Sequence, residues 1–448
     1  MKHATAAPSS RVQEIPGRSP RLRHVTPPDP HGLTLAPFRG LRYVPDQVHS
    51  LSAVTSPPYD VVVRPDEVVE LEGADPHNIV RLILPRDGER EPSHARAAQT
   101  LRHWQELGVL VADDTPALYV YEQHTADDVL QRGLIGNLRL PTLDEGVVLP
   151  HEDVMPAPVA DRAGLMRATA ANLEPLLLAY RGDGPGTAAR IIDAIVEHPP
   201  LLATTTEDGT RHRLWAITGH DEIAAVNADL APRQALIADG HHRWATYLRL
   251  REEHQSPSPW DYGLVLLVDT DRYPLRVGAI HRVLRQLPVA DALSAVRDSF
   301  RIEQVDDPLD TALAALADAI AVGGNAYLLA GDGTFHLLTL PDERLVDASV
   351  PRDRPTSWRR LDASVLHYAM IDHLWHVPDA PEHISYIHDA PAAVHEAERL
   401  GGTAVLMHPI AESTVLDLAR QGVMMPHKST SFGPKPASGL LLRSLELN

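Results

Sequence analysis

One stretch of sequence, residues 235–244, constrains the fold more than any other, because an apolar strand-like run turns abruptly into a helical pattern. The run breaks at an Asp-Gly pair, and Trp244, Tyr247 and Leu248 then recur at the i, i+3, i+4 spacing of an amphipathic helix. This spacing predicts a buried strand that passes directly into a helix over residues 240–254.

The start of this helix has the residue types of an anion-binding site. Asp239 and Gly240 are followed by His241, His242 and Arg243. Free N–H groups and the helix dipole favour a negative charge at this position, and Gly240 lets the backbone approach a ligand. A second interpretation stays open, because Asp-Gly is an ordinary turn and the chain contains 25 His.

Composition narrows the classes of function. The net charge is −19, and no basic tract follows about the first two dozen residues, so nucleic acid is not an expected partner of the folded part. The absence of Cys excludes disulfides, thiolate catalysis and Cys-ligated zinc. The apolar runs are strand-sized, so we expect no membrane span and a cytoplasmic protein.

The periodicity predicts a mixed α/β (α+β) fold in three parts. Residues 1–30 are rich in Pro, Ser and Arg and are expected to be a disordered leader. Residues 31–288 read as strands and amphipathic helices, among them an apolar strand over 79–84. Residues 289–448 alternate helices with short strands, which predicts a C-terminal α/β layer.

A second polar concentration precedes the central stretch. His151 and Glu152 are followed within about two dozen residues by Asp161, Arg162 and Asn172. Carboxylates, an imidazole and a guanidinium gathered in so short a segment favour a polar site. Surface helices also mix Asp with Arg, so a solvated face is the alternative.

Lysine is nearly absent, and its positions are informative. The chain has only Lys2, Lys428 and Lys435, whereas its other basic residues are Arg. The Lys pair lies in a loop with Ser429 and Thr430, which suggests positions that need a compact ammonium. Such a loop can donate many hydrogen bonds to phosphate, although it lacks the Gly spacing of a Walker loop.

Taken in order, these motifs resemble a known family. The segments are Ser-Pro-Pro-Tyr-Asp (56–60), His-Glu (151–152), Asp-Arg (161–162), Asn172 with Pro175, Ile-Ala-Asp-Gly-His-His-Arg (237–243), Leu-Asp-Ala-Ser-Val-Leu-His (361–367) and Met-Pro-His-Lys-Ser-Thr-Ser-Phe-Gly-Pro-Lys (425–435). They resemble the family called domain of unknown function 1015, over nearly everything from residue 34 onward.

The Asp-Gly-His-His-Arg stretch is in turn similar to the nucleotide-binding box of the ParB and sulfiredoxin superfamily, which includes free-serine kinases. The resemblance implies a ParB/sulfiredoxin-like core and a kinase with L-serine or a similar metabolite as acceptor. Val154 and Ala157 stand where many family members have Thr and Lys. Sulfiredoxin chemistry is excluded because it needs a Cys where this chain has His241.

On this hypothesis the site residues take defined roles. Glu152 is the first candidate for the base, with His151 and Asp60 as reserves, and Asp239 orients these groups or holds Mg²⁺ through water. Arg162 and Asn172 would bind the substrate. The expected ligands of the nucleotide phosphates are Gly240, His241, His242, Arg243, Lys428, Ser429, Thr430 and Lys435.

Several alternatives stay open from the sequence. The cofactor could be ATP, ADP or CTP, and no residue specifies serine. A phosphoester hydrolase acting on a compound such as phosphoserine, or a nucleotide-binding switch without turnover, would use the same anion cradle. A His-based metal hydrolase is weaker, because no His-x-x-x-His or His-Glu-x-x-His spacing occurs. The oligomeric state is not predicted.

Overall fold

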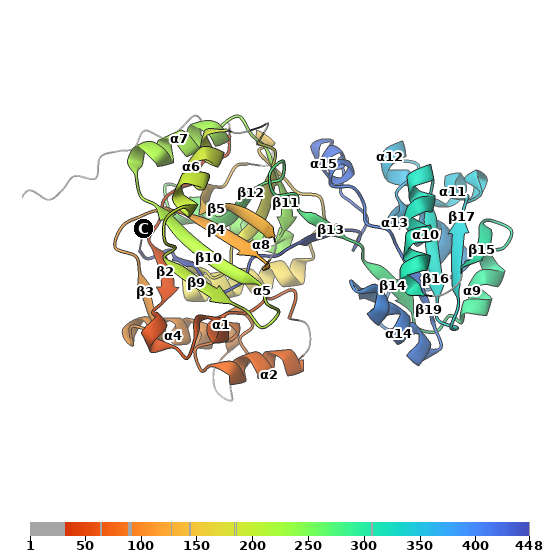
Figure 1. Ribbon diagram of the computed structural model, residues 1–448, viewed down its shortest axis with the longest axis horizontal. Helices are drawn as coiled ribbons and strands as arrows, with labels where there is room; N and C mark the ends of the chain where they lie inside the picture. Colours follow the sequence, from red (N-terminus) through yellow and green to blue (C-terminus); the bar gives the residue numbers. More distant parts are fainter. Residues whose placement is uncertain are drawn as a thin grey trace, which may run out of the picture. The chain divides into compact units, whose positions relative to one another are not determined.

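The computed structural model describes residues 32–62, 65–87, 92–126, 128–142, 145–182, 184, 186–305 and 308–447. Within these ranges, four β-sheets alternate with helices (Figure 1), which confirms the mixed α/β class. The expected leader over 1–30 lies outside the described residues.

The largest sheet supplies the strand that the sequence pattern centres on. Its order is β6(Val148–Leu149), β11(Ala235–Asp239), β8(Leu176–Tyr180), β12(Tyr262–Asp269), β5(Val129–Arg139), β4(Leu118–His124), β10(Arg211–Ile217) and β9(Leu202–Thr205), with β1(Leu35–Ala36) paired to β5. The pairs β6–β11 and β8–β12 are parallel, and the others are antiparallel.

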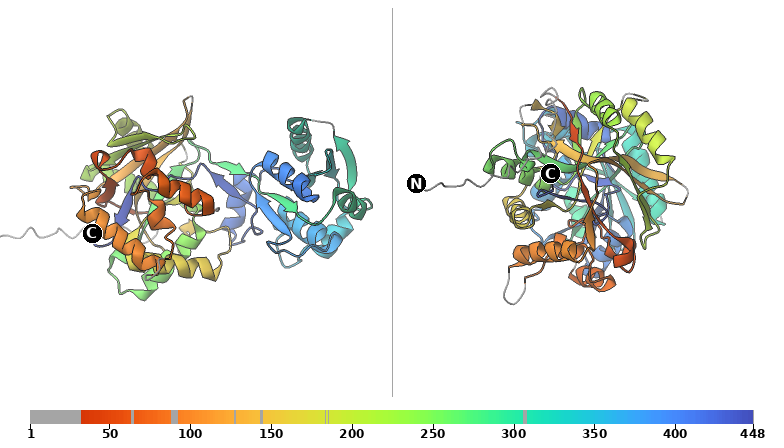
Figure 2. Two further views of the ribbon diagram at one scale, coloured as in Figure 1. Left: turned by 90° about the horizontal axis from the view of Figure 1, so that it is seen from below. Right: turned by 90° about the vertical axis from the view of Figure 1, so that its left-hand side faces the viewer.

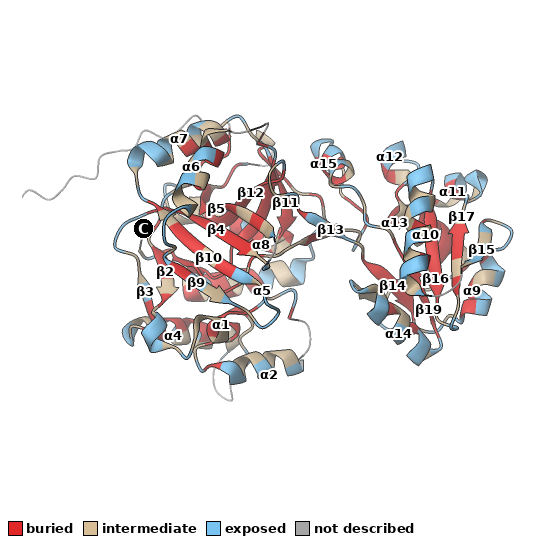
Figure 3. Ribbon diagram, viewed as in Figure 1, coloured by how far each residue is buried: buried red, intermediate tan, exposed pale blue. Residues whose placement is uncertain are grey.

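Both faces of this sheet are covered. Ala235 and Ile237 of β11 pack into one apolar cluster with residues of α6(Thr187–Val196), α7(His220–Leu230) and α8(His241–Glu253). Leu236 and Ala238 belong to a second cluster, on the opposite side of the strand. All five residues of β11 are therefore buried, as a strand covered on both sides requires (Figure 3).

A six-stranded sheet organises most of the C-terminal half. Its order is β15(Arg301–Val305), β17(Phe335–Thr339), β16(Ala326–Ala330), β19(Thr403–Leu406), β14(His281–Leu284) and β18(Ile384–Ile387). Residues of α10(Leu309–Val322) and α14(Ala390–Leu400) share one apolar cluster with it. Residues of α9(Val289–Val296) and a π-helix over Leu366–Leu374 pack with alternate strand residues in another.

Two smaller sheets tie the C-terminal segment to the rest of the chain (Figure 2). One has the order β3(Leu110–Ala112), β2(Gly40–Tyr43), β21(Leu442–Ser444) and β7(Ala171–Asn172), and the other pairs β13(Arg276–Gly278) with β20(Ser431–Gly433). As a result, the loop that contains both C-terminal lysines is led back to the largest sheet, where β20 contacts β11.

The remaining helices connect and cover these sheets. They are α1(Leu51–Val54), α2(Pro65–Ala74), α3(Val80–Ile83), α4(Ser93–Glu106), α5(Pro156–Thr169), α11(Glu343–Ser349), α12(Thr356–Arg359), α13(Asp362–Val365) and α15(Glu412–Arg420), with 3₁₀ turns at Pro45–Gln47 and Pro259–Asp261. None of the helices in the described ranges is long and apolar enough to cross a membrane.

One predicted strand is wrong. Residues 79–84, read as an apolar strand, form the short helix α3 instead. Asn78 explains the difference, because its Oδ1 accepts a hydrogen bond from the N–H of Val80, at 2.9 Å, and so favours a helical turn. A run of apolar residues this short has no periodicity that separates a buried strand from a buried helix.

Candidate functional site

Two parallel strands bring the separate polar motifs together. Because β6 and β11 run side by side, the residues that follow each strand emerge at the same edge of the sheet. His151 and Glu152 follow β6, and Asp239 is the last residue of β11. The backbone N–H of His151 lies 3.3 Å from Nε2 of His241, so the two motifs are in direct contact.

The predicted turn between strand and helix is confirmed, and it requires glycine. Gly240 has a φ of +97°, and a Cβ at this position would lie 2.5 Å from Cδ2 of Leu176 and 3.2 Å from Nε of Arg243. Helix α8 then begins at His241, directly after a buried strand. A side chain would be both strained and crowded, so only glycine fits without displacing its neighbours.

An ion cluster occupies the end of β11, where Asp239 is buried and Lys435 and Asp60 are partly exposed. Nζ of Lys435 lies 2.6 Å from Oδ1 of Asp239 and 2.6 Å from Oδ2 of Asp60. Burial and the neighbouring Asp60 raise the pKa of Asp239. Burial would also raise the pKa of Asp60, but the Lys435 ammonium and the Arg243 guanidinium together outweigh this effect and lower the pKa. Two carboxylates from distant parts of the chain thus share one ammonium.

Arg243 is the fourth charged residue of this cluster. Its Nη2 lies 2.6 Å from Oδ2 of Asp239, and its Nη1 donates to the carbonyl of Pro175 at 3.0 Å and lies 4.0 Å from Oε2 of Glu174. The side chain is 2% exposed. Arg243 is therefore held by protein groups, which does not favour its predicted direct contact with phosphate.

Three imidazoles surround the start of α8. The rings of His151 and His241 meet edge to face, with centroids 4.5 Å apart, and Nε2 of His242 accepts from the N–H of Met155 at 3.1 Å. Burial lowers the pKa of His151 to about 4 and also lowers the pKa values of His241 and His242. At neutral pH these rings are uncharged, so they offer N–H donors and lone pairs rather than positive charge.

Glu152 lies between the imidazoles and the C-terminal loop. Its Oε2 is 3.8 Å from Nδ1 of His241, and the side chain is 28% exposed. Burial raises the pKa of Glu152, whereas the nearby Lys428 opposes the rise. A carboxylate with a raised pKa is a better proton acceptor than an ordinary one, and this carboxylate can still be reached from solvent.

The C-terminal loop contacts the imidazoles of this site through Thr430. Oγ1 of Thr430 lies 3.0 Å from Nε2 of His151, and Oγ of Ser429 is buried without a hydrogen-bond partner among the described residues. Lys428 has an exposed side chain and a φ of +53°, and its carbonyl accepts from Nη2 of Arg282 at 3.0 Å. A buried guanidinium therefore holds the backbone of this loop.

Two predicted substrate ligands are not brought into this cluster. Asn172 is buried on β7, where its Oδ1 accepts from Nη1 of Arg443 at 3.0 Å, because β7 pairs with β21. Arg162 donates to the carbonyl of Ile83 at 2.6 Å and to Asp161, and is separated from the ion cluster by Tyr59. Neither geometry favours the predicted substrate contact.

The structure adds residues that sequence reasoning did not select. Glu174 accepts hydrogen bonds from the N–H of Tyr59 and from Oγ of Ser438, and so joins three segments. Arg282 donates a hydrogen bond to the carbonyl of Lys428. Burial lowers the pKa of His388, and the nearby Lys435 ammonium lowers it further. Tyr59 belongs to the Ser-Pro-Pro-Tyr-Asp motif and Glu174 directly precedes the motif residue Pro175, which was the available signal. Arg282 and His388 carried no such signal.

The arrangement can hold an anion beside a proton acceptor. N–H donors and ammonium groups lie near Glu152, and the carboxylates of Asp60 and Asp239 offer oxygen ligands. No cluster of three or more His, Asp or Glu residues placed to hold a metal ion occurs in the described part of the chain. A closed, all-protein metal centre is thus not found there.

Comparison with solved structures gives distant similarities. A mutant free serine kinase in complex with AMP matches at 14% identity and a TM-score of 0.33, over 67% of this chain and 86% of that one. A mutant free serine kinase in complex with ADP matches at 13% and 0.34, over 67% and 87%. A conserved hypothetical protein from Pyrococcus furiosus matches at 14% and 0.34, over 70% and 97%. These TM-scores are too low to assign an activity.

The comparison by sequence is more decisive. No curated protein matches the chain. The family model described as "Protein of unknown function (DUF1015)" matches residues 35–364, which is well over half of the chain. This match includes the Ser-Pro-Pro-Tyr-Asp, His-Glu and Asp-Gly-His-His-Arg motifs, and so confirms the family suggested by those residues. The chain therefore belongs to the DUF1015 family.

Proposed function

We propose that this protein is a nucleotide-dependent kinase that phosphorylates the hydroxyl group of a small metabolite, with free L-serine as the first acceptor to examine. The observation that carries the proposal is the meeting of Glu152, the start of α8 and the Lys428–Lys435 loop at one edge of the largest sheet. Phosphoryl transfer needs mainly positioning and charge neutralisation, together with a group that accepts the hydroxyl proton. This edge offers each of these.

Glu152 is the proposed proton acceptor. Its carboxylate is partly exposed, and burial raises its pKa. In the proposed step, the acceptor hydroxyl loses its proton to Glu152 while its oxygen bonds to the terminal phosphorus of the nucleotide. The bond from that phosphorus to the bridging oxygen breaks, so the products are a phosphate monoester and a nucleotide with one phosphate fewer.

The nucleotide phosphates are proposed to bind between α8 and the C-terminal loop. Backbone N–H groups at His241 and His242, the ammonium of Lys428 and the hydroxyl groups of Ser429 and Thr430 are the donors there. Arg243 is proposed as a positioning residue, because its guanidinium holds Asp239 at 2.6 Å from within the core. ATP or ADP is the nucleotide implied by the resemblance of this stretch.

Mg²⁺ fits the donor chemistry of the same edge. Asp60 and Asp239 provide the carboxylate oxygens that this ion prefers, and both now share the Lys435 ammonium. When bound, Mg²⁺ would neutralise part of the phosphate charge. The proposed role of Asp239 is to hold the ion through water. The proposed role of Lys435 is to offset the repulsion between the two carboxylates until a ligand binds.

The first experiment is thermal unfolding with ATP, ADP and CTP in the presence of Mg²⁺, because a ligand that binds only the native state raises the melting temperature. Transfer of labelled phosphate to L-serine would then be measured with the nucleotide that binds. Glu152→Gln should abolish transfer and keep the nucleotide-dependent shift. Glu253→Gln, a surface change in a carboxylate paired with Arg167, is the matched control and should keep both.

The outcomes separate the kinase from its rivals. Nucleotide consumption only in the presence of acceptor supports the kinase. Release of phosphate from a phosphoester without nucleotide would instead identify a hydrolase. Nucleotide binding with neither reaction would identify a switch. If none of the three nucleotides shifts the melting temperature, the kinase proposal and the switch both fail.

A further inference from the structure

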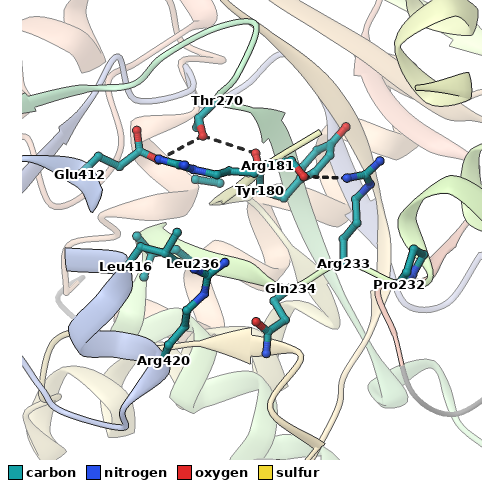
Figure 4. A pocket seen from close by; sticks show the side chains of 11 residues that line it. Tyr180, Arg181, Pro232, Arg233, Gln234, Leu236, Thr270, Glu412, Leu416 and Arg420 are labelled. Carbon is teal, nitrogen blue, oxygen red and sulfur yellow. Dashed lines mark hydrogen bonds between the residues drawn. The ribbon is translucent and has the colours of Figure 1, made fainter. Parts of the chain in front are cut away.

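A pocket lies away from the Lys435 cluster. Its volume is about 420 Å³, within the range typical of small-molecule sites (Figure 4). Leu236, in the first half of β11, and Gln234, just before it, form part of the lining. Asp239 ends the same strand about 10 Å further on, so the two sites lie toward opposite ends of β11.

The pocket is formed where two parallel strands end. Strands β8 and β12 run in the same direction, and the pocket is lined by Tyr180 and Arg181 at the end of β8 and by Thr270 just after β12. Ligands bind preferentially in the crevice outside the carboxyl ends of parallel strands. Leu416, from α15, lines the pocket together with Leu236, so an apolar surface lies among the polar groups.

The charged groups of the lining do not cancel. Arg233 is compensated, because its Nη2 lies 3.0 Å from Oδ1 of Asp229. Glu412 accepts a hydrogen bond from Oγ1 of Thr270 at 3.0 Å, and it is the single carboxylate of the lining.

Two guanidinium groups remain with weak or no partners. Nη1 of Arg420 lies 4.0 Å from Oδ1 of an exposed aspartate, Asp417. The guanidinium of Arg181 has no hydrogen bond or ion pair to the described residues. Both side chains are exposed, and together they outnumber the one carboxylate, so the lining carries an excess of positive charge in a protein whose net charge is −19.

We propose that this pocket is a second binding site, for a small ligand that carries a phosphate group. Arg181 and Arg420 bind its oxygens in charge-assisted hydrogen bonds, and Leu236 and Leu416 contact its carbon skeleton. The ligand would join β11 to α15. Since α15 ends only eight residues before Lys428, the occupied pocket restrains the segment that enters the C-terminal loop.

The test is a calorimetric titration of the whole protein with pyrophosphate as the probe. The double variant Arg181→Gln with Arg420→Gln should lose one binding event, or bind at that event about tenfold more weakly. The control is Arg297→Gln with Arg301→Gln, which removes two exposed guanidinium groups that do not line the pocket and should titrate as the unchanged protein does. Lys428→Ala should leave the pocket event in place.

Each result of the titration either supports or overturns the pocket as a binding site, and this proposal does not depend on the kinase hypothesis. Loss of an event in the pocket variant alone supports it. The proposal is overturned if pyrophosphate does not bind, if the pocket variant titrates as the control does, or if every binding event disappears in Lys428→Ala. The last result would assign the probe to the proposed phosphate site at Lys428 and would still agree with the proposed kinase.

Discussion

Nζ of Lys435 lies 2.6 Å from Oδ1 of Asp239, so a residue of the C-terminal loop neutralises a carboxylate at the end of the central strand. Asp60 approaches the same ammonium at 2.6 Å. A compact ammonium can lie between two carboxylates in this way, whereas a planar guanidinium spreads its charge over a wider fork. This geometry gives a physical reason for a lysine in a chain whose basic residues are otherwise almost all Arg.

The first prediction concerns stability. Lys435→Met leaves Asp239 and Asp60 facing each other without their shared ammonium. Because Asp239 is buried whereas Lys435 and Asp60 are partly exposed, we expect the free energy of unfolding to fall by about 2 kcal/mol. Urea unfolding at neutral pH measures the change. Arg399→Met, which breaks an exposed pair with Glu396, is the control and should cost about 0.5 kcal/mol or less. Equal effects of the two changes would contradict a structural role for the Lys435 cluster.

The second prediction concerns pH. Glu152 acts as a base only when it is ionised, so kcat/KM should rise as the pH rises through its pKa. Burial raises this pKa and the Lys428 ammonium lowers it. Lys428→Ala should therefore shift the acid limb of the pH profile to higher pH, while Lys428→Arg, which keeps the charge, should leave it nearly in place. An acid limb that stays put in Lys428→Ala, or moves to lower pH, would remove Glu152 from the role of base.

Much of the fold follows from local patterns. The eight-residue run that forms β12 is continuously apolar up to its last residue, and α8 begins where the Asp-Gly pair interrupts β11. Local patterns did not predict which distant strands pair with each other. β21 inserts between β2 and β7, and β20 pairs with β13, because the end of the chain returns to cover earlier segments. Such contacts depend on tertiary packing.

The site was predictable to the extent that its residue types were unusual. His241, Glu152 and Lys435 come from three motifs, and their convergence follows once β6 and β11 are parallel and the C-terminal loop returns to them. Partners were not predictable. Arg162 and Arg243 looked like free guanidinium groups in the sequence, but the structure surrounds both with carbonyl and carboxylate oxygens. Residue type alone does not say whether a charge is already satisfied.

The third prediction compares two glycines with positive φ. Gly240→Ala would place a Cβ 2.5 Å from Cδ2 of Leu176, whereas Gly209→Ala, at a φ of +81°, meets nothing within 4 Å. Both variants carry backbone strain of about 1 kcal/mol, and Gly240→Ala adds a clash that we expect to double or triple the loss of stability. Urea unfolding measures both. Equal losses would mean that the α8 junction has more room than the structure gives it.

The fourth prediction separates a ligand contact from a structural one. Oγ of Ser429 is buried without a partner among the described residues, whereas Oγ of Ser364 donates to the carbonyl of Trp358 at 2.7 Å. Because removing an unpaired hydroxyl breaks no hydrogen bond, Ser429→Ala should leave the stability within about 0.5 kcal/mol of the original. If Ser429 donates to a nucleotide phosphate, the same change should weaken nucleotide binding about tenfold.

Ser364→Ala should show the reverse pattern, with a loss of stability of about 1 kcal/mol and unchanged affinity. Isothermal titration with the nucleotide and urea unfolding of both variants give the four values. Because the two substitutions remove the same atom, their opposite effects would assign the Ser429 hydroxyl to the ligand rather than to the fold. If Ser429→Ala binds nucleotide as the unchanged protein does, the C-terminal loop does not contact the phosphates through this residue.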